Sequence, residues 1–288
     1  MRRAALVVCF LCAFVSAGAA AQWLNYKTPG VPRTRDGKPK LSAPAPRTVD
    51  GHPDLTGVWL HELSSVAEIR RLFGPIIDDA VKVDAPGMEI GTQHKYGLDI
   101  LIDFKPENSP MRPETAAAYQ RRQAVPPPED LCDASGLPAG FPLAGLLSEP
   151  IKIVQAPKLT MVMYEVGGDF RQIYVDGRKL PAEFNLPAYY GYSVGHWERD
   201  TFVVESAGFN EKTALDAFGH PHSAQLRVVE RFRRRDFGHL DVEMTFDDPK
   251  MYSRPFTVRV PHNLLADADI FEMFGENEKD CGHIGAKH

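Results

Sequence analysis

The second half of the chain is built from short runs in which apolar and polar residues alternate. Turn residues such as Gly167-Gly168-Asp169, Asp176-Gly177 and Asp236-Phe237-Gly238 separate one run from the next. Alternation with a period of two residues, bounded by turn signals, is typical of half-buried β-strands. The pattern predicts a first strand at 57–60 and further strands at residues 151–155, 159–165, 170–175, 190–197, 201–207, 226–234, 239–246, 255–260 and 270–274.

The predicted strands follow one another through short turns without intervening helices, which favours an antiparallel meander. A sheet of about nine strands leaves costly edges, and closing the sheet removes them. The first strand opens with Gly57-Val58-Trp59, which is similar to the Gly-x-Trp that opens lipocalin-like barrels. We therefore expect a mainly β protein whose antiparallel meander closes into a lipocalin-like, or calycin-like, barrel.

The first half of the chain contributes a few short helices and much irregular backbone. Residues 64–73 and 113–123 have helical character, and the second of these segments has Pro113 near its start and an alanine-rich body. Proline-rich connections follow them. We expect one barrel domain over residues 55–288, with a helical and proline-rich insertion at about 61–150.

Residues 22–54 are rich in proline and basic residues and show little periodicity, which predicts an extended segment that wraps the surface or stays mobile. Within this segment, residues 33–42 and 47–56 repeat a pattern that begins with Arg-Thr and contains Asp-Gly. Asp-Gly is a turn signal, and two polar copies are too few for a solenoid. We expect two similar surface loops that lead into the first strand.

The N-terminus predicts export from the cytoplasm. Arg2 and Arg3 precede an apolar run from Ala4 to Val15, and small residues continue to Ala21. This order is typical of a secretory signal peptide at residues 1–21, and the apolar run is short for a membrane span. We expect a periplasmic or secreted mature protein with no membrane span.

Two of the four cysteines, Cys132 and Cys281, lie outside the predicted signal peptide. An oxidising compartment favours a disulfide between them, and two buried free thiols are the alternative, because the sequence gives no geometry. The net charge of −5 and the pI of about 6.1 argue against a nucleic-acid partner.

Candidate chemistry concentrates in a polar loop between two predicted strands. Asp216, His220 and His222 lie in it, and Glu230 follows on the next strand. Histidine titrates close to physiological pH, so one of the two is expected to act as a general acid or base, oriented by Asp216 or Glu230. Two alternatives remain: a metal site of His220, His222 and Glu230, and two turn histidines bonded to the backbone. Of these interpretations we favour acid–base chemistry without a metal or cofactor.

Glu230 is expected on the inward face of its strand, with Leu226, Val228 and Phe232. An inward carboxylate is either paired with a cation, for which Arg171 is the candidate, or functional. Residues assigned to substrate binding are Arg171 or Tyr174, either of which would hold a developing anion, and aromatic side chains that could stack on a ligand. The set is Arg171, Tyr174, Tyr192, Trp197 and Phe209.

Several motifs occur together in the chain, and they cover most of it after residue 50. They lie at residues 54–59, 170–178, 191–198, 219–223 (Gly-His-Pro-His-Ser), 230–234 (Glu-Arg-Phe-Arg-Arg) and 247–250. Their combination resembles a family of secreted bacterial proteins found in soil bacteria such as acidobacteria. The resemblance implies a class and a compartment and no particular reaction. Members often carry a cysteine just before the stretch matching 276–278, where this chain has Gly275.

These features favour a secreted β-barrel enzyme that uses general acid–base catalysis on a small apolar or aromatic molecule, as a lyase, isomerase or hydrolase. The alternative is a non-catalytic, lipocalin-like protein that binds a hydrophobic small molecule.

Overall fold

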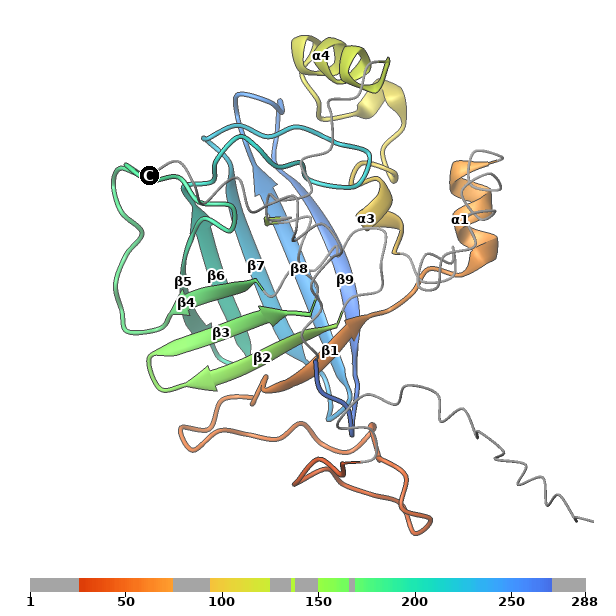
Figure 1. Cartoon of the computed structure of the whole chain (residues 1–288), viewed down its shortest axis with the longest axis vertical. Helices are drawn as coiled ribbons and strands as arrows, with labels where there is room; N and C mark the ends of the chain where they lie inside the picture. The colour runs from red at the N-terminus through yellow and green to blue at the C-terminus, as the bar shows by residue number, and fades with distance from the viewer. Residues whose placement is uncertain (1–25, 75–93, 125–135, 138–149, 166–168, 271–288) are drawn as a thin grey trace, which may run out of the picture.

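Nine strands close into a barrel in the computed structural model of this protein (Figure 1). The structure describes residues 26–74, 94–124, 136–137, 150–165 and 169–270. The strands follow the chain order around the barrel, and the last pairs with the first. They are β1 Gly57–His61, β2 Ile151–Ala156, β3 Leu159–Tyr164, β4 Phe170–Tyr174, β5 Tyr192–Glu198, β6 Thr201–Ala207, β7 Arg227–Arg234, β8 His239–Asp247 and β9 Phe256–Leu264.

The expectation of a mainly β chain that closes into a barrel is confirmed. A relationship to lipocalins in particular stays a prediction. The predicted signal peptide, Cys132 and Cys281 lie outside the described residues, as does the predicted strand at 270–274 beyond Ile270.

The prediction of a purely antiparallel meander is wrong at one junction, because β4 and β5 pair in parallel. Their ladder joins Ile173 to Ser193 and Tyr174 to Val194. Parallel neighbours cannot be joined by a tight turn, so residues 175–191 must carry the chain back along the barrel before β5 begins. The signal at Asp176-Gly177 therefore opens a long connection instead of a hairpin.

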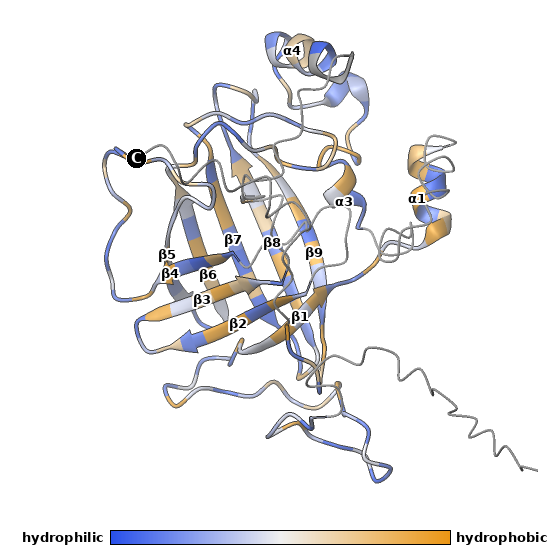
Figure 2. Cartoon of the chain, viewed as in Figure 1, coloured by the Kyte–Doolittle hydropathy of each residue, from blue (hydrophilic) through white to orange (hydrophobic). Residues whose placement is uncertain are grey.

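Apolar and polar residues alternate along the strands, which Figure 2 shows as bands of orange and blue. The buried residues form a packed interior. On β7, Val228, Glu230 and Phe232 are buried, whereas Arg227 and Arg233 are exposed. This confirms the inward face predicted for the strand. The interior holds apolar side chains that are almost fully buried, among them Trp59, Phe202, Phe232, Phe246, Val258 and Val260.

An ion pair crosses this interior. Arg171 on β4 donates from Nη1 to Glu230 Oε1 at 3.0 Å and from Nη2 to Glu230 Oε2 at 2.5 Å. The same guanidinium donates from Nε to Ser193 Oγ on β5 at 3.0 Å and from Nη2 to Ser206 Oγ on β6 at 2.7 Å. The two charged side chains are 1% and 0% exposed. The predicted pairing of Arg171 with Glu230 is therefore confirmed, and it links four strands.

The helices lie outside the strands: α1 Val66–Phe73, α3 Lys95–Leu98, the 3₁₀ turn η2 Pro106–Asn108 and α4 Pro113–Ala124. Ser65 caps α1, since its Oγ accepts the N–H of Glu68 at 3.1 Å. The two predicted helices are confirmed, and α3 and η2 were not predicted. Within the described part of the chain, no helix combines the length and apolar character needed to cross a bilayer.

The N-terminal segment from residue 26 wraps one end of the barrel, at the bottom of Figure 1. Its two repeated loops have the same hydrogen bonds: Arg33 Nη1 donates to Gly37 O at 3.0 Å, and Arg47 Nη1 donates to Gly51 O at 2.6 Å. Each arginine also pairs with a carboxylate of the barrel, Arg33 with Asp267 and Arg47 with Asp200. The prediction of two similar surface loops is confirmed.

The opposite end is covered by two segments that dock on each other, residues 94–104 and the loop at 208–226 (Figure 1). The N–H groups of Ala217 and Phe218 donate to the carbonyls of Gly97 and Leu98, at 2.9 and 3.1 Å. Ile100 and Leu101 belong to the same hydrophobic core as the barrel interior. Docking of these segments places the polar loop that carries Asp216, His220 and His222 at this end of the barrel.

Replacing Glu230 by Gln should show what the internal ion pair contributes. The change leaves the Arg171 guanidinium buried without its counter-charge, which costs about 3–5 kcal/mol. We expect a loss of this size in the free energy of unfolding, measured by urea denaturation.

Glu198→Gln is the matched control, because Glu198 pairs with Arg231 at 2.6 Å on the surface, where water screens the charges. It should cost far less. The double replacement Arg171→Met with Glu230→Leu should recover much of the loss, since no unpaired charge remains. Equal losses in the free energy of unfolding for Glu230→Gln and Glu198→Gln would show that the buried ion pair stabilises the fold no more than a surface pair does.

Candidate active site

One carboxylate ties the loop at 208–226 to the segment at 94–104. Asp216 Oδ2 accepts the N–H of Ile100 at 2.7 Å, and Asp216 Oδ1 accepts the N–H of His220 at 3.0 Å. The Asp216 side chain is 0% exposed. A buried carboxylate needs hydrogen-bond donors, and these amides supply them. The buried carboxylate of Asp216 therefore holds the loop at this end of the barrel.

His220 lies against this carboxylate, with its Nδ1 2.6 Å from Asp216 Oδ2. A turn brings the two together: the N–H of Gly219 donates to Asp216 O at 3.0 Å, and Gly219 has a φ of 82°, which glycine adopts without strain. The ring of Tyr119 from α4 stacks on the imidazole, with centroids 4.4 Å apart and planes 15° apart. Of the two candidate histidines, His220 is the one paired with Asp216.

Asp99 adds a second carboxylate beside the pair. Its Oδ1 lies 3.9 Å from His220 Nδ1 and accepts the N–H of Leu101 at 2.8 Å. Burial raises the pKa of Asp99 above its ordinary value, although His220 opposes the change. Burial, with both carboxylates nearby, also raises the pKa of Tyr119, so its phenol stays protonated.

Among the described residues, Asp99, Asp216 and His220 form the group whose ligand atoms lie close enough to share a cation, within 4.8 Å of one another. The 2.6 Å between His220 Nδ1 and Asp216 is, however, a hydrogen-bond distance, which places a proton between these atoms. This geometry leaves Nε2 as the nitrogen that can exchange a proton with a substrate. Within the described residues, no hydrogen bond engages that nitrogen.

His222 has a different environment, because both its nitrogens contact protein atoms. Nε2 lies 2.8 Å from Thr213 Oγ1, and Nδ1 lies 3.3 Å from the carbonyl of Ser223. A carbonyl can only accept, so Nδ1 carries the proton and Nε2 accepts from the threonine. Burial lowers the pKa of His222, against smaller effects from Ser223 and Asp248. His222 is therefore held neutral and is fully engaged in the fold.

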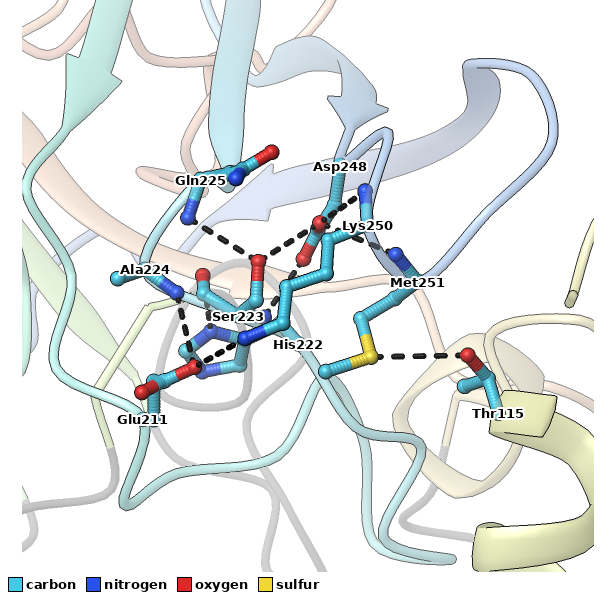
Figure 3. Close-up of polar contacts among 9 residues, drawn as sticks. All are labelled: Thr115, Glu211, His222, Ser223, Ala224, Gln225, Asp248, Lys250 and Met251. Atoms are coloured by element: carbon cyan, nitrogen blue, oxygen red, sulfur yellow. Dashed lines mark hydrogen bonds and ion pairs between the residues drawn. The ribbon is translucent and has the colours of Figure 1, made fainter.

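A second buried carboxylate anchors the loop next to His222, as Figure 3 shows. Asp248, after β8, accepts the N–H and the Oγ–H of Ser223 at 2.6 and 2.8 Å. It also accepts the N–H groups of Lys250 and Met251, at 3.2 and 3.3 Å. Asp248 thus fixes the end of the loop to the β8–β9 connection, as Asp216 fixes its middle to residues 94–104.

The structure separates Glu230 and Arg171 from the two loop histidines. Their charged groups bond to each other and to Ser193 and Ser206 inside the barrel. Among the described residues, the ligand atoms of His220, His222 and Glu230 do not converge on a common point. The alternative of a metal site built from these three is therefore wrong, because the arginine holds the glutamate in the core.

The aromatic residues assigned to substrate binding do not gather around His220. Phe209 is fully buried, with its ring centroid 6.2 Å from that of His222. Trp197 stacks on His52, Tyr174 lies under the guanidinium of Arg178, and Tyr192 donates to Leu186 O at 2.8 Å. These contacts are spread over separate parts of the barrel.

Sequence reasoning missed the other residues around His220 and His222, which are Asp99, Tyr119, Thr213 and Asp248. Asp99 and Tyr119 reach the site through the docking of distant segments, which leaves no local signal. Thr213 and Asp248 lie in or near the polar loop, where turn residues are common.

Comparison with known proteins gives no match: no family model, no curated protein and no solved structure corresponds to the chain. The resemblance to the secreted bacterial family continues to rest on the motifs themselves.

The environment of His222 predicts a pH-dependent contribution to stability. Its pKa is lower in the folded protein than in the unfolded chain, so the unfolded chain binds more protons as the pH falls below about 6.5. The stabilising effect is complete above that pH and is lost progressively below it. The stability advantage of the wild type over His222→Gln should therefore shrink between pH 7 and pH 5, measured by urea denaturation.

Gln225→Ala is a control, because this exposed side chain does not titrate. Its effect on the free energy of unfolding should be the same at both pH values. A constant advantage over His222→Gln would show that His222 takes up its proton in the folded state.

Proposed function

We propose that this protein is an enzyme in which His220 acts as a general acid and base, oriented by Asp216, on a small apolar or aromatic molecule. The observation that carries the proposal is the 2.6 Å contact between His220 Nδ1 and a fully buried carboxylate that backbone amides also hold. A histidine fixed through Nδ1 presents Nε2 in one tautomer and one orientation. The signal peptide expected at residues 1–21 supports a location for this activity in the periplasm or outside the cell.

The two ring nitrogens of His220 have different roles: Nδ1 is bonded to Asp216, and Nε2 faces the substrate. Nε2 takes a proton from the substrate or, in a hydrolase, from the water that attacks it, and Asp216 stabilises the positive charge that forms. The same nitrogen then gives the proton to another atom of the substrate, or to the leaving group as its bond breaks. A proton transfer of this kind requires no cofactor and serves a lyase, an isomerase or a hydrolase. Asp99, whose pKa burial raises, is the nearest second carboxylate for the complementary proton.

The surroundings of the pair favour an apolar or aromatic substrate. Tyr119 covers one face of the His220 ring, and the adjoining Ile100 and Leu215 are buried apolar residues. A low-polarity environment strengthens the attraction between the imidazolium and Asp216. Glu230 and Arg171 are assigned a structural role, because their polar atoms are committed to one another inside the barrel.

The test compares His220→Gln and Asp216→Asn with the wild type on a panel of small aromatic and apolar esters, epoxides and ketones, followed by mass spectrometry. We expect at least one compound to be converted by the wild type, with a rate about 10²–10⁴-fold lower for His220→Gln. Asp216→Asn should also be slow, because the imidazolium loses its counter-charge.

His222→Gln is the matched control, since His222 lies two residues away and is engaged by Thr213. It should keep the rate within a few-fold of the wild type, provided that it folds. A conversion that survives His220→Gln would contradict the proposal.

The alternative of a binding protein is favoured by a separate observation at the other end of the barrel. A cavity of about 640 Å³ lies between the N-terminal segment and the strands. Val58, Phe237 and Leu264 give it apolar walls, and Arg234 and the Lys152–Asp269 ion pair add polar groups. A cavity of this size and lining is typical of sites for small organic ligands.

Native mass spectrometry distinguishes this alternative from catalysis at His220. A binder should retain an organic molecule in the wild type and equally in His220→Gln. Ala266→Phe, which fills the cavity from its wall, should release it. Retention by the Ala266→Phe variant would exclude this cavity as the binding site.

A further inference from the structure

The imidazole of His220 is almost completely covered in the structure. His220 is 4% exposed, and the ring of Tyr119 from α4 lies over one face of its imidazole, with 4.4 Å between the two centroids. A substrate has to come within hydrogen-bond distance of Nε2 to exchange a proton with it. An element that covers His220 therefore has to move before a substrate can reach this nitrogen.

Two of the described segments around His220 are firmly attached to the barrel. The loop at 208–226 is anchored by the buried carboxylates of Asp216 and Asp248. The segment at 94–104 accepts backbone N–H groups from this loop and contributes Ile100 and Leu101 to the hydrophobic core. Moving either segment would break buried hydrogen bonds or expose apolar surface, and both changes are unfavourable.

Helix α4 is attached to the barrel near its start. Arg112, just before the helix, donates from its backbone N–H to Met251 O at 3.0 Å and from Nε to Pro249 O at 2.9 Å. The hydroxyl of Thr115 donates to Met251 Sδ at 3.6 Å, as Figure 3 shows. Within the described part of the chain, no hydrogen bond or ion pair joins residues 116–121 to another segment.

Little buried apolar surface stabilises the later part of α4. Tyr119 is the one large apolar side chain among residues 116–124, and Ala118 and Gln120 are exposed. The helix stands outside the barrel in Figure 1, and no other described helix or strand packs along it. Local unfolding requires the least free energy where buried apolar contacts are few. Of the described segments around His220, the later part of α4 is therefore the one that opens most easily.

We propose that α4 gates the candidate active site, given the catalytic role proposed for His220: the helix unfolds locally from Ala116 on and carries Tyr119 away from the imidazole. The start of the helix keeps its bonds to the β8–β9 connection, so the segment stays attached and closes again. Closure returns the aromatic ring to the imidazole and keeps water from it. Access of any molecule to Nε2 is then set by the fraction of chains in which α4 is open.

The test measures how fast diethyl pyrocarbonate, which acylates accessible imidazole nitrogens, modifies His220 in the full chain, with the site assigned by peptide mass spectrometry. In the wild type, His220 should react several-fold more slowly than His196, whose side chain is 52% exposed. Tyr119→Ala removes the stack and should speed the reaction of His220 by about two- to tenfold, the factor that corresponds to one aromatic pair. Tyr119→Phe keeps an aromatic ring and should react as the wild type does.

A glycine substitution separates movement of the helix from simple shielding by the tyrosine ring. Ala118→Gly leaves the stack in place, and a glycine in an exposed helix destabilises it enough to raise the open fraction by about fivefold. We expect the same factor in the rate at which His220 is modified. Ala67→Gly is the matched control, because it makes the same change at an exposed alanine of α1, and it should leave this rate unchanged.

Modification of wild-type His220 at the rate of His196, no effect of Tyr119→Ala, or equal rates for Ala118→Gly and Ala67→Gly would each overturn the gate. His222 should stay slow in every variant, because both its nitrogens are engaged. Circular dichroism checks folding, and Ala118→Gly decides if Tyr119→Ala does not fold. The reaction with diethyl pyrocarbonate needs no turnover. Gated modification without conversion of any compound would therefore contradict the proposed catalysis and leave the gate standing.

Discussion

The barrel depends on one guanidinium group. The parallel ladder between β4 and β5 is the shortest in the described barrel, because it pairs two residues from each strand. Arg171, on β4, compensates by donating to Ser193 on β5, Ser206 on β6 and Glu230 on β7. Side-chain bonds thus close the part of the wall where backbone bonds are few. Because the arginine and the glutamate are both buried, each is tolerated only in the presence of the other.

Buried charged groups with hydrogen-bond partners also hold the end of the barrel together, where the charged groups are carboxylates surrounded by donors. Asp216 and Asp248 are both in the interior, and each accepts backbone N–H groups from segments that the chain order does not bring together. The consequence for His220 is that its orientation is set by the fold before any substrate arrives. Preorganisation of this kind is what acid–base catalysis requires, because no free energy is then spent on fixing the proton acceptor. His222 lies in the same loop but has no nitrogen available for a substrate, because both its nitrogens bond to atoms of the loop.

Much of the fold was predictable, because strands and hairpins are local patterns. The alternation over residues 226–234 correctly identified the inward face that carries Glu230, and the Asp-Gly turns correctly identified the repeated loops. The parallel pairing of β4 and β5 was not predictable, since a turn signal does not say how long the connection after it will be. The pairing of Asp216 with a loop histidine was among the predicted alternatives, because these residues share one polar loop. The places of Asp99 and Tyr119 depend on docking between distant segments, and periodicity carries no information about that.

The repeated loops of the N-terminal segment have a consequence for how the chain reaches this structure. Because Arg33 and Arg47 are held by the same internal bonds, those bonds do not select a carboxylate for either arginine. An exchange of Asp267 and Asp200 between them would still satisfy both ion pairs, so misdocking is a hazard intrinsic to the duplication. Discrimination comes from neighbours that are not duplicated: Thr28, whose N–H donates to Asp267, and the stack of His52 on Trp197. One hydrogen bond and one aromatic stack, and not the strength of either ion pair, then distinguish the native arrangement from the exchanged one.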